Sequence, residues 1–139
     1  MRYPLTYEVT AEPEIVNHSI IKWILQPIVE NAIIHGIDPL RSEGNITINA
    51  RSDKDRILFS ITDNGVGIEP SKLSEIREQL KYGSATLTKY KNRVDLYNVQ
   101  TRILSHYGDE FGLSIESTVN KGTSVTITLP KEEGGNGNA

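Results

Sequence analysis

The sequence predicts an α+β protein, a two-layer sandwich in which about three helices cover one face of a mixed, mostly antiparallel sheet. Short segments in which apolar and polar residues alternate are joined by turn residues, as in antiparallel hairpins. Longer segments carry apolar residues at three- and four-residue steps, as in helices that bury one face. These two kinds of segment do not alternate regularly along the chain, as they would in a parallel α/β protein.

Length and composition fit one globular domain. Of the 139 residues, 37% are hydrophobic and 24% charged, and the net charge of -3 gives no basis for binding nucleic acid or an anionic membrane. Cysteine is absent, which excludes disulfides and thiolate metal sites. No apolar run approaches the roughly 20 residues of a membrane span, and the N-terminus lacks a signal-peptide pattern, so we expect a soluble chain. Because it opens directly with strand-like sequence, it is compatible with being a piece of a larger protein.

The first part of the chain should hold an edge strand and a long helix. Residues 3–11 alternate loosely, which indicates a short strand at an edge of the sheet. From residue 19 to about residue 35, apolar residues recur at helical spacing, which predicts a helix that buries one broad face. Pro27 lies inside this helix and should kink or divide it, and Gly36 should end it. The polar residues 38–45 predict a loop.

A hairpin and a modest helix should follow. Residues 46–50 and 57–63 alternate on either side of a turn at residues 53–55, so they should pair as antiparallel strands. Ser71 should cap a helix that runs to about Tyr82.

The last part of the chain should begin with a mobile loop, because residues 83–92 are polar and nearly lack apolar side chains. A helix is expected from near residue 94 until Gly108 ends it. Two alternating strands should follow, at residues 111–116 and 125–130, joined by a turn. The tail, residues 132–139, is rich in glycine and asparagine and should be disordered.

The most informative stretch runs from the second hairpin strand into Asp63-Asn64-Gly65-Val66-Gly67. A carboxylate at the end of a buried strand can accept hydrogen bonds in a half-dry site, and the two glycines let the backbone turn and leave room for a ligand. The alternative is a structural hairpin, since Asn-Gly is a strong turn signal. A hairpin needs a second strand directly after the turn, and Gly67 and Pro70 interrupt it.

The first helix carries a second candidate pair, Asn31 and His35, which are four residues apart and therefore share a helix face. A buried Asn in a helix must find hydrogen-bond partners, which a ligand can supply. Alone, each residue has a simpler interpretation. Asn31 can be an exposed or satisfied polar residue, and His35 a cation that complements the helix C-terminus.

Four motifs occur in order along most of the chain, from about Tyr7 to Pro130. They are QPIVENAIIHG at residues 26–36, DNGVGI at 63–68, LYNVQTRI at 96–103 and KGTSVTI at 121–127. Together they resemble the ATP-binding catalytic domain of sensor histidine kinases, from the superfamily shared with DNA gyrase and MutL, and most of all its YesM/LytS-like branch. The resemblance implies a Bergerat-type ATP-binding fold over residues 1–131, with ATP and Mg²⁺ as cofactors.

The resemblance also implies roles for individual residues. Asn31 should ligate the Mg²⁺ that bridges the ATP phosphates, and Asp63 should accept a hydrogen bond from the exocyclic amine of adenine. Gly65 and Gly67 should line the base pocket and the root of a lid. Further nucleotide-binding residues are expected at His35, Ile68, Leu96 and Thr123, with Thr123 close to Asp63.

The phosphate region departs from the family pattern. Relatives have Gly-x-Gly just before the third motif, where backbone approaches the phosphates, and this chain has Arg93-Val94-Asp95. Asp95 would add negative charge near the triphosphate, whereas Arg93, Lys89 and Lys91 offer compensating cations. The helix that begins near residue 94 should still point its N-terminus at the phosphates, and residues 83–92 should form the ATP lid.

The expected reaction is phosphoryl transfer rather than hydrolysis. Relatives that hydrolyse ATP have a Glu four residues before the helix Asn, and this chain has Pro27 there. Glu30 is a second catalytic candidate, although it lies about 100° around the helix from Asn31 and is equally compatible with a solvated charge. None of the three histidines, His18, His35 and His106, lies in a motif that matches a phosphate acceptor.

The resemblance therefore implies the catalytic domain of a bacterial two-component sensor histidine kinase, a cytoplasmic part of a membrane-anchored protein. Its expected partners are the dimerisation and histidine-phosphotransfer domain of the same protein and a response regulator, with no nucleic acid and no membrane contact of its own. A regulatory module with a degenerate phosphate loop is the first alternative. An anti-sigma-factor serine kinase of similar fold is the second.

Overall fold

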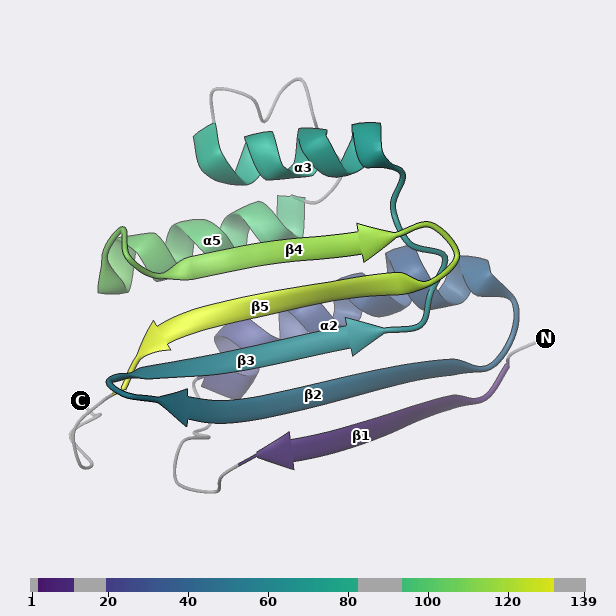
Figure 1. Ribbon diagram of the computed structural model, residues 1–139, viewed down its shortest axis with the longest axis horizontal. Helices are drawn as coiled ribbons and strands as arrows, with labels where there is room; N and C mark the ends of the chain where they lie inside the picture. The colour runs from purple at the N-terminus through teal and green to yellow at the C-terminus, as the bar shows by residue number, and fades with distance from the viewer. Residues whose placement is uncertain (1–2, 12–19, 83–93, 132–139) are drawn as a thin grey trace.

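The computed structural model describes residues 3–11, 20–82 and 94–131. It has a mixed five-stranded sheet in the order β1-β2-β3-β5-β4, in which β1 runs parallel to β2 and the other neighbours are antiparallel (Figure 1). The strands are β1 (Leu5–Ala11), β2 (Gly44–Asp53), β3 (Arg56–Asp63), β4 (Gly112–Thr118) and β5 (Gly122–Pro130). The predicted α+β fold is confirmed.

The described ranges also contain three α-helices: α2 (Gln26–Ala32), α3 (Pro70–Tyr82) and α5 (Val94–Tyr107). In Figure 1, α2 and α5 lie behind the sheet, and α3 packs against β4 and α5. Helix α5 ends before Gly108, as expected, where the backbone takes a φ of 108°.

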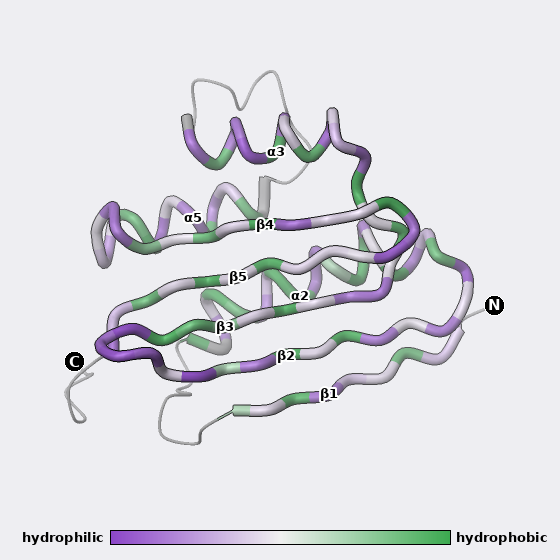
Figure 2. The backbone as a smooth tube through the Cα atoms, in the orientation of Figure 1, coloured by the Kyte–Doolittle hydropathy of each residue, from purple (hydrophilic) through white to green (hydrophobic). Residues whose placement is uncertain are grey.

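The core lies between the helices and one face of the sheet. Along β3 and β5, hydrophobic residues alternate with hydrophilic ones (Figure 2), which gives the sheet one apolar face. Phe59 and Ile127 of these strands and Ile103 of α5 are fully buried in one core cluster. Burying a side chain of this size contributes about 1.5–3 kcal/mol. This packing fixes the helices, and hence the residues they carry, relative to the strand ends.

The first helix differs from its prediction. It combines a π-helical segment η2 (Ile21–Leu25), α2, a second π-helical segment η3 (Ile33–Ile37) and a short 3₁₀ turn η4 (Asp38–Leu40). The division falls just before Pro27, which lies in the first turn of α2, where a missing N–H costs least. Gly36 does not end the helix. It lies within η3, and the helical path ends at Arg41, whose φ is 57°.

Several boundaries also differ from the expected ones. The loop predicted at residues 38–45 begins as η4 and ends inside β2. Helix α3 begins at Pro70 rather than after a Ser71 cap, because proline is preorganised for the first helical position. The expected mobile loop at 83–92 and the expected disordered tail at 132–139 lie outside the described residues.

Candidate functional site

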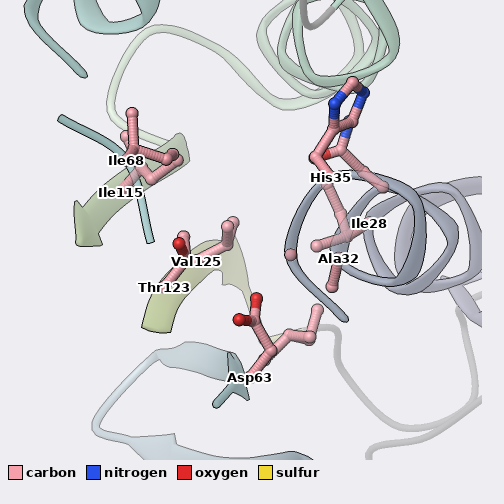
Figure 3. A pocket seen from close by; sticks show the side chains of 11 residues that line it. Ile28, Ala32, His35, Asp63, Ile68, Ile115, Thr123 and Val125 are labelled. Atoms are coloured by element: carbon pink, nitrogen blue, oxygen red, sulfur yellow. The ribbon is translucent and has the colours of Figure 1, made fainter. Parts of the chain in front are cut away.

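A hollow opens between the first helix and the ends of β3, β4 and β5 (Figure 3). Its cavity volume is only about 20 Å³, and the space between atoms reaches about 370 Å³ when the open solvent at its mouth is included. Its walls are mostly apolar, with a few polar groups, as is usual for a small-molecule site. The lining residues are Ile28, Asn31, Ala32, His35, Gly36, Ile61, Asp63, Ile68, Ile115, Thr123 and Val125.

Asp63 supplies a carboxylate to this hollow. It is the last residue of β3 and is 5% exposed, and Figure 3 shows its side chain extending into the space between β5 and the helix. Its Oδ1 accepts a hydrogen bond from the backbone N–H of Gly65 at 2.7 Å. This bond holds the carboxylate in one orientation at the wall of the hollow.

Asn31 reaches the same hollow from the opposite side. It is 7% exposed, and its Nδ2 has no hydrogen-bond partner among the residues that the structure describes. A buried amide without a partner costs about 1–3 kcal/mol. Such a group at the wall of a hollow indicates a site that a polar ligand completes.

The glycines of this region allow backbones to approach each other closely. A Cβ on Gly65 would lie 2.3 Å from the carbonyl carbon of Gly36, and one on Gly67, whose φ is 76°, would lie 2.1 Å from the carbonyl oxygen of Thr118. Val66 between them donates its N–H to the Gly36 carbonyl at 3.1 Å. The chain after Asp63 is therefore held between η3 and the β4–β5 turn. Gly65 and Gly67 themselves do not line the hollow.

Thr123 lies opposite Asp63 in the β3–β5 register and lines the hollow. Its Oγ1 is 2.8 Å from Oγ of Ser117, which also accepts a hydrogen bond from the backbone N–H of Ile68 at 2.9 Å. Sequence analysis did not identify Ser117. Its only signal is its place opposite Thr123 in the β4–β5 pairing, which is not evident without the sheet register.

The structure brings together five of the predicted site residues: Asn31, His35, Asp63, Ile68 and Thr123. His35 lines the hollow from an exposed position. Two further candidates lie elsewhere. Glu30 is exposed, and its Oε2 accepts a hydrogen bond from Nε2 of Gln26 at 3.2 Å, whereas Leu96 is a core residue. Arg93 and the side chains of Val94 and Asp95 lie outside the described part of the chain.

Within the described ranges, no group of three or more His, Cys, Asp or Glu residues is placed to hold a metal ion by itself. Likewise, none of the helices in those ranges has the length and hydropathy needed to cross a bilayer.

Comparison with known proteins shows which family the chain is similar to. The family described as histidine kinase-, DNA gyrase B-, and HSP90-like ATPase matches residues 17–133. The sensor protein LytS of Bacillus anthracis is 31% identical over 138 residues, which cover 96% of this chain and 22% of LytS. The sensor histidine kinase YpdA of Escherichia coli is 32% identical over 119 residues, covering 86% of this chain and 19% of YpdA. The chain thus spans about a fifth of the length of these relatives.

Solved structures share the fold. The nucleotide-free catalytic domain of the histidine kinase ThkA has a TM-score of 0.65 at 19% identity, covering 93% of this chain and 80% of the ThkA chain. The mycobacterial sensor histidine kinase MprB has a TM-score of 0.61 at 19% identity, covering 91% and 81%. The extent of the family match, with LytS among the relatives, shows that the chain belongs to the histidine kinase-, DNA gyrase B- and HSP90-like ATPase family.

Proposed function

We propose that this chain is the ATP-binding catalytic domain of a bacterial two-component sensor histidine kinase, and that it supports transfer of the γ-phosphoryl group of ATP to a histidine on a separate dimerisation domain. The observation that supports this most strongly is that Asp63 and Asn31, from the sheet and the first helix, line the same hollow. A carboxylate and a carboxamide facing one space can bind the two ends of a nucleotide.

The base is proposed to lie at Asp63. The carboxylate accepts a hydrogen bond from the exocyclic amine of adenine, while Ile68, Ile115 and Val125 supply apolar contacts to the ring. The structure supports this because the carboxylate is buried and already oriented by Gly65. In this proposal Gly65 and Gly67 shape the pocket through the backbone, without touching the base.

Asn31 is proposed to hold the Mg²⁺ that accompanies the phosphates. The residues fit this ion, because a carboxamide oxygen is a hard ligand and Mg²⁺ is usually held by one or two protein groups together with phosphates and water. The Asn31 Nδ2 cannot bind a cation and has no partner among the described residues, so in this proposal it donates a hydrogen bond to a phosphate oxygen while Oδ1 faces the ion. When bound, Mg²⁺ neutralises charge that develops on the phosphates.

The residues around the proposed site favour phosphoryl transfer over ATP hydrolysis. Among the described lining residues, Asp63 is the single carboxylate, and it is engaged with Gly65. Pro27 stands where hydrolysing relatives carry a base, so an attacking water lacks an activating group. Glu30 is exposed beside Asn31, and we assign it to the transfer step with an incoming histidine rather than to nucleotide binding.

The remaining parts of the proposal concern the whole protein. The chain spans about a fifth of LytS-like relatives, so the acceptor histidine and the dimerisation domain are assigned to sequence outside it. We assign the folded domain to residues 1–131, in the cytoplasm as part of a membrane-anchored protein, with a response regulator as the downstream partner. Neither nucleic acid nor the membrane surface is proposed as a partner of this domain.

One sequence feature supports a second candidate function. Arg93-Val94-Asp95 replaces the glycines that bring backbone to the phosphates, which favours a regulatory module that binds ATP weakly or not at all. Calorimetric titration of the domain with ATP and Mg²⁺ separates the two candidates. Saturable binding is expected for the kinase domain, and no heat at millimolar nucleotide would support the regulatory module instead.

The transfer step is tested in the longer protein, incubated with ATP labelled at the γ-phosphate. We expect label that is lost in acid and stable in base, because a phosphorylated histidine is acid-labile. Acid-stable label would contradict the proposal and favour a serine kinase of the same fold.

A further inference from the structure

Ser117, on β4, makes three polar contacts at the edge of the candidate site. Its Oγ lies 2.9 Å from the backbone N of Ile68, 2.9 Å from the carbonyl oxygen of Gly122 and 2.8 Å from Oγ1 of Thr123. Ile68 and Thr123 both line the hollow. Ser117 therefore connects two walls of the site without lining it.

The number of available hydrogens fixes the direction of these bonds. A hydroxyl has one hydrogen to donate and two lone pairs that accept. The N–H of Ile68 can only donate, and the carbonyl of Gly122 can only accept, so the single Ser117 hydrogen is directed to Gly122. The third contact is then satisfied only if Thr123 donates its hydroxyl hydrogen to Ser117. Thr123 is left with lone pairs, and no hydrogen, for the hollow.

The direction of these hydrogen bonds determines which ligand edge can bind in the site. Asp63, the cross-strand partner of Thr123, is an acceptor as an ionised carboxylate. Two neighbouring acceptors favour a ligand edge that carries two hydrogens, and they disfavour one that carries a carbonyl oxygen. An exocyclic amine at C6 of a purine has two hydrogens, whereas a 6-oxopurine has an acceptor in the same place.

We propose that Ser117 is a positioning residue that determines base specificity: by accepting the Thr123 hydrogen, it makes Thr123 an acceptor and directs the site to 6-aminopurine nucleotides over 6-oxopurine nucleotides. The inference rests on the proposed nucleotide-binding function. It assigns to Ser117 an effect on the ratio of two affinities, which a purely structural role would not produce.

The test is calorimetric titration with ATP and with ITP, each with Mg²⁺, of the wild type, Ser117→Ala and Thr123→Val. In Ser117→Ala the Thr123 hydroxyl is free to rotate and donate into the site. We expect ATP affinity to fall about three- to tenfold, the contribution of one hydrogen bond, with ITP affinity unchanged or higher. Ser117→Thr, which keeps the hydroxyl, should retain the wild-type ratio. Ser114→Ala, at an exposed position of the same strand, is the matched control.

A double-mutant cycle separates positioning from structural support. Ser117→Ala should leave the ATP-to-ITP ratio unchanged when Thr123 is already Val, because the hydroxyl that Ser117 directs is then absent. If Ser117→Ala lowers both affinities equally, or changes the ratio equally in both backgrounds, the inference is wrong although the proposed function stands. If the wild type binds neither nucleotide, the proposed function fails and this inference with it.

Discussion

At the scale of single residues, the candidate site combines one polar group that is already satisfied with one that is not. Asp63 is oriented by the N–H of Gly65, so the carboxylate is in place before any ligand arrives. The amide of Asn31 is buried with no partner for its Nδ2 among the described residues. Sites often carry such a cost, because groups arranged for a ligand stabilise the protein less than apolar side chains would.

Replacing Asn31 with Leu should therefore stabilise the domain and abolish Mg²⁺-dependent ATP binding. The free energy of unfolding is expected to rise by about 1 kcal/mol, since the buried amide is removed. Urea denaturation measures the stability and calorimetry the binding. Asn98→Leu, at an exposed position of α5, is the control for the greater helix propensity of Leu. If Asn31→Leu unfolds more easily than the wild type, the amide is already well satisfied and the interpretation is wrong.

At the scale of elements, the site depends on contact between segments that are far apart in the chain. The π-helical segment η3 approaches the end of β3 at Gly36, where a Cβ would lie 2.9 Å from Oδ1 of Asp63. Gly122 has the same role on the other side, since a Cβ there would lie 2.0 Å from the backbone oxygen of Asp63. Asp63 thus occupies a space that two glycines leave open.

Gly36→Ala should displace the Asp63 carboxylate and weaken ATP binding by about tenfold or more, because overpacking of this kind costs about 1–3 kcal/mol. Calorimetry measures the loss. Gly108→Ala is the matched control: its φ of 108° is unfavourable for Ala, but a Cβ there meets nothing within 4 Å. That variant should lose stability and keep its affinity. Wild-type ATP affinity in Gly36→Ala would show that the carboxylate is not confined as described.

At the scale of the whole molecule, local sequence patterns were sufficient to predict the helices and strands. Features that depend on contacts between distant segments could not be predicted in this way. Alternation and helical spacing were sufficient to predict the central strands and the end of α5 at Gly108, because each depends on neighbouring residues. Gly36 was predicted to end a helix, as glycines often do, but it is required for contact with Gly65 and Asp63. The role of Ser117 likewise depends on the pairing of β4 with β5. No local pattern indicates such contacts.

The candidate site likewise contains residues that the sequence patterns predicted and residues that they did not. Its central pair was predicted because Asp63 ends an alternating strand and Asn31 shares a helix face with His35, and the four motifs together indicated one ligand. The apolar walls at Ile115 and Val125 were not predicted as site residues, because their alternation indicates only core. The parallel pairing of β1 with β2 was expected only in the general sense of a mixed sheet.

The central claim is that Asp63 binds the base of a nucleotide in the hollow it shares with Asn31. Titration of Asp63→Ala with ATP and Mg²⁺ by calorimetry tests it most directly. The control is Asp53→Ala, an exposed aspartate at the opposite end of the β2–β3 hairpin. We predict that Asp63→Ala abolishes detectable binding while Asp53→Ala binds like the wild type, and undiminished binding by a folded Asp63→Ala variant would contradict the account.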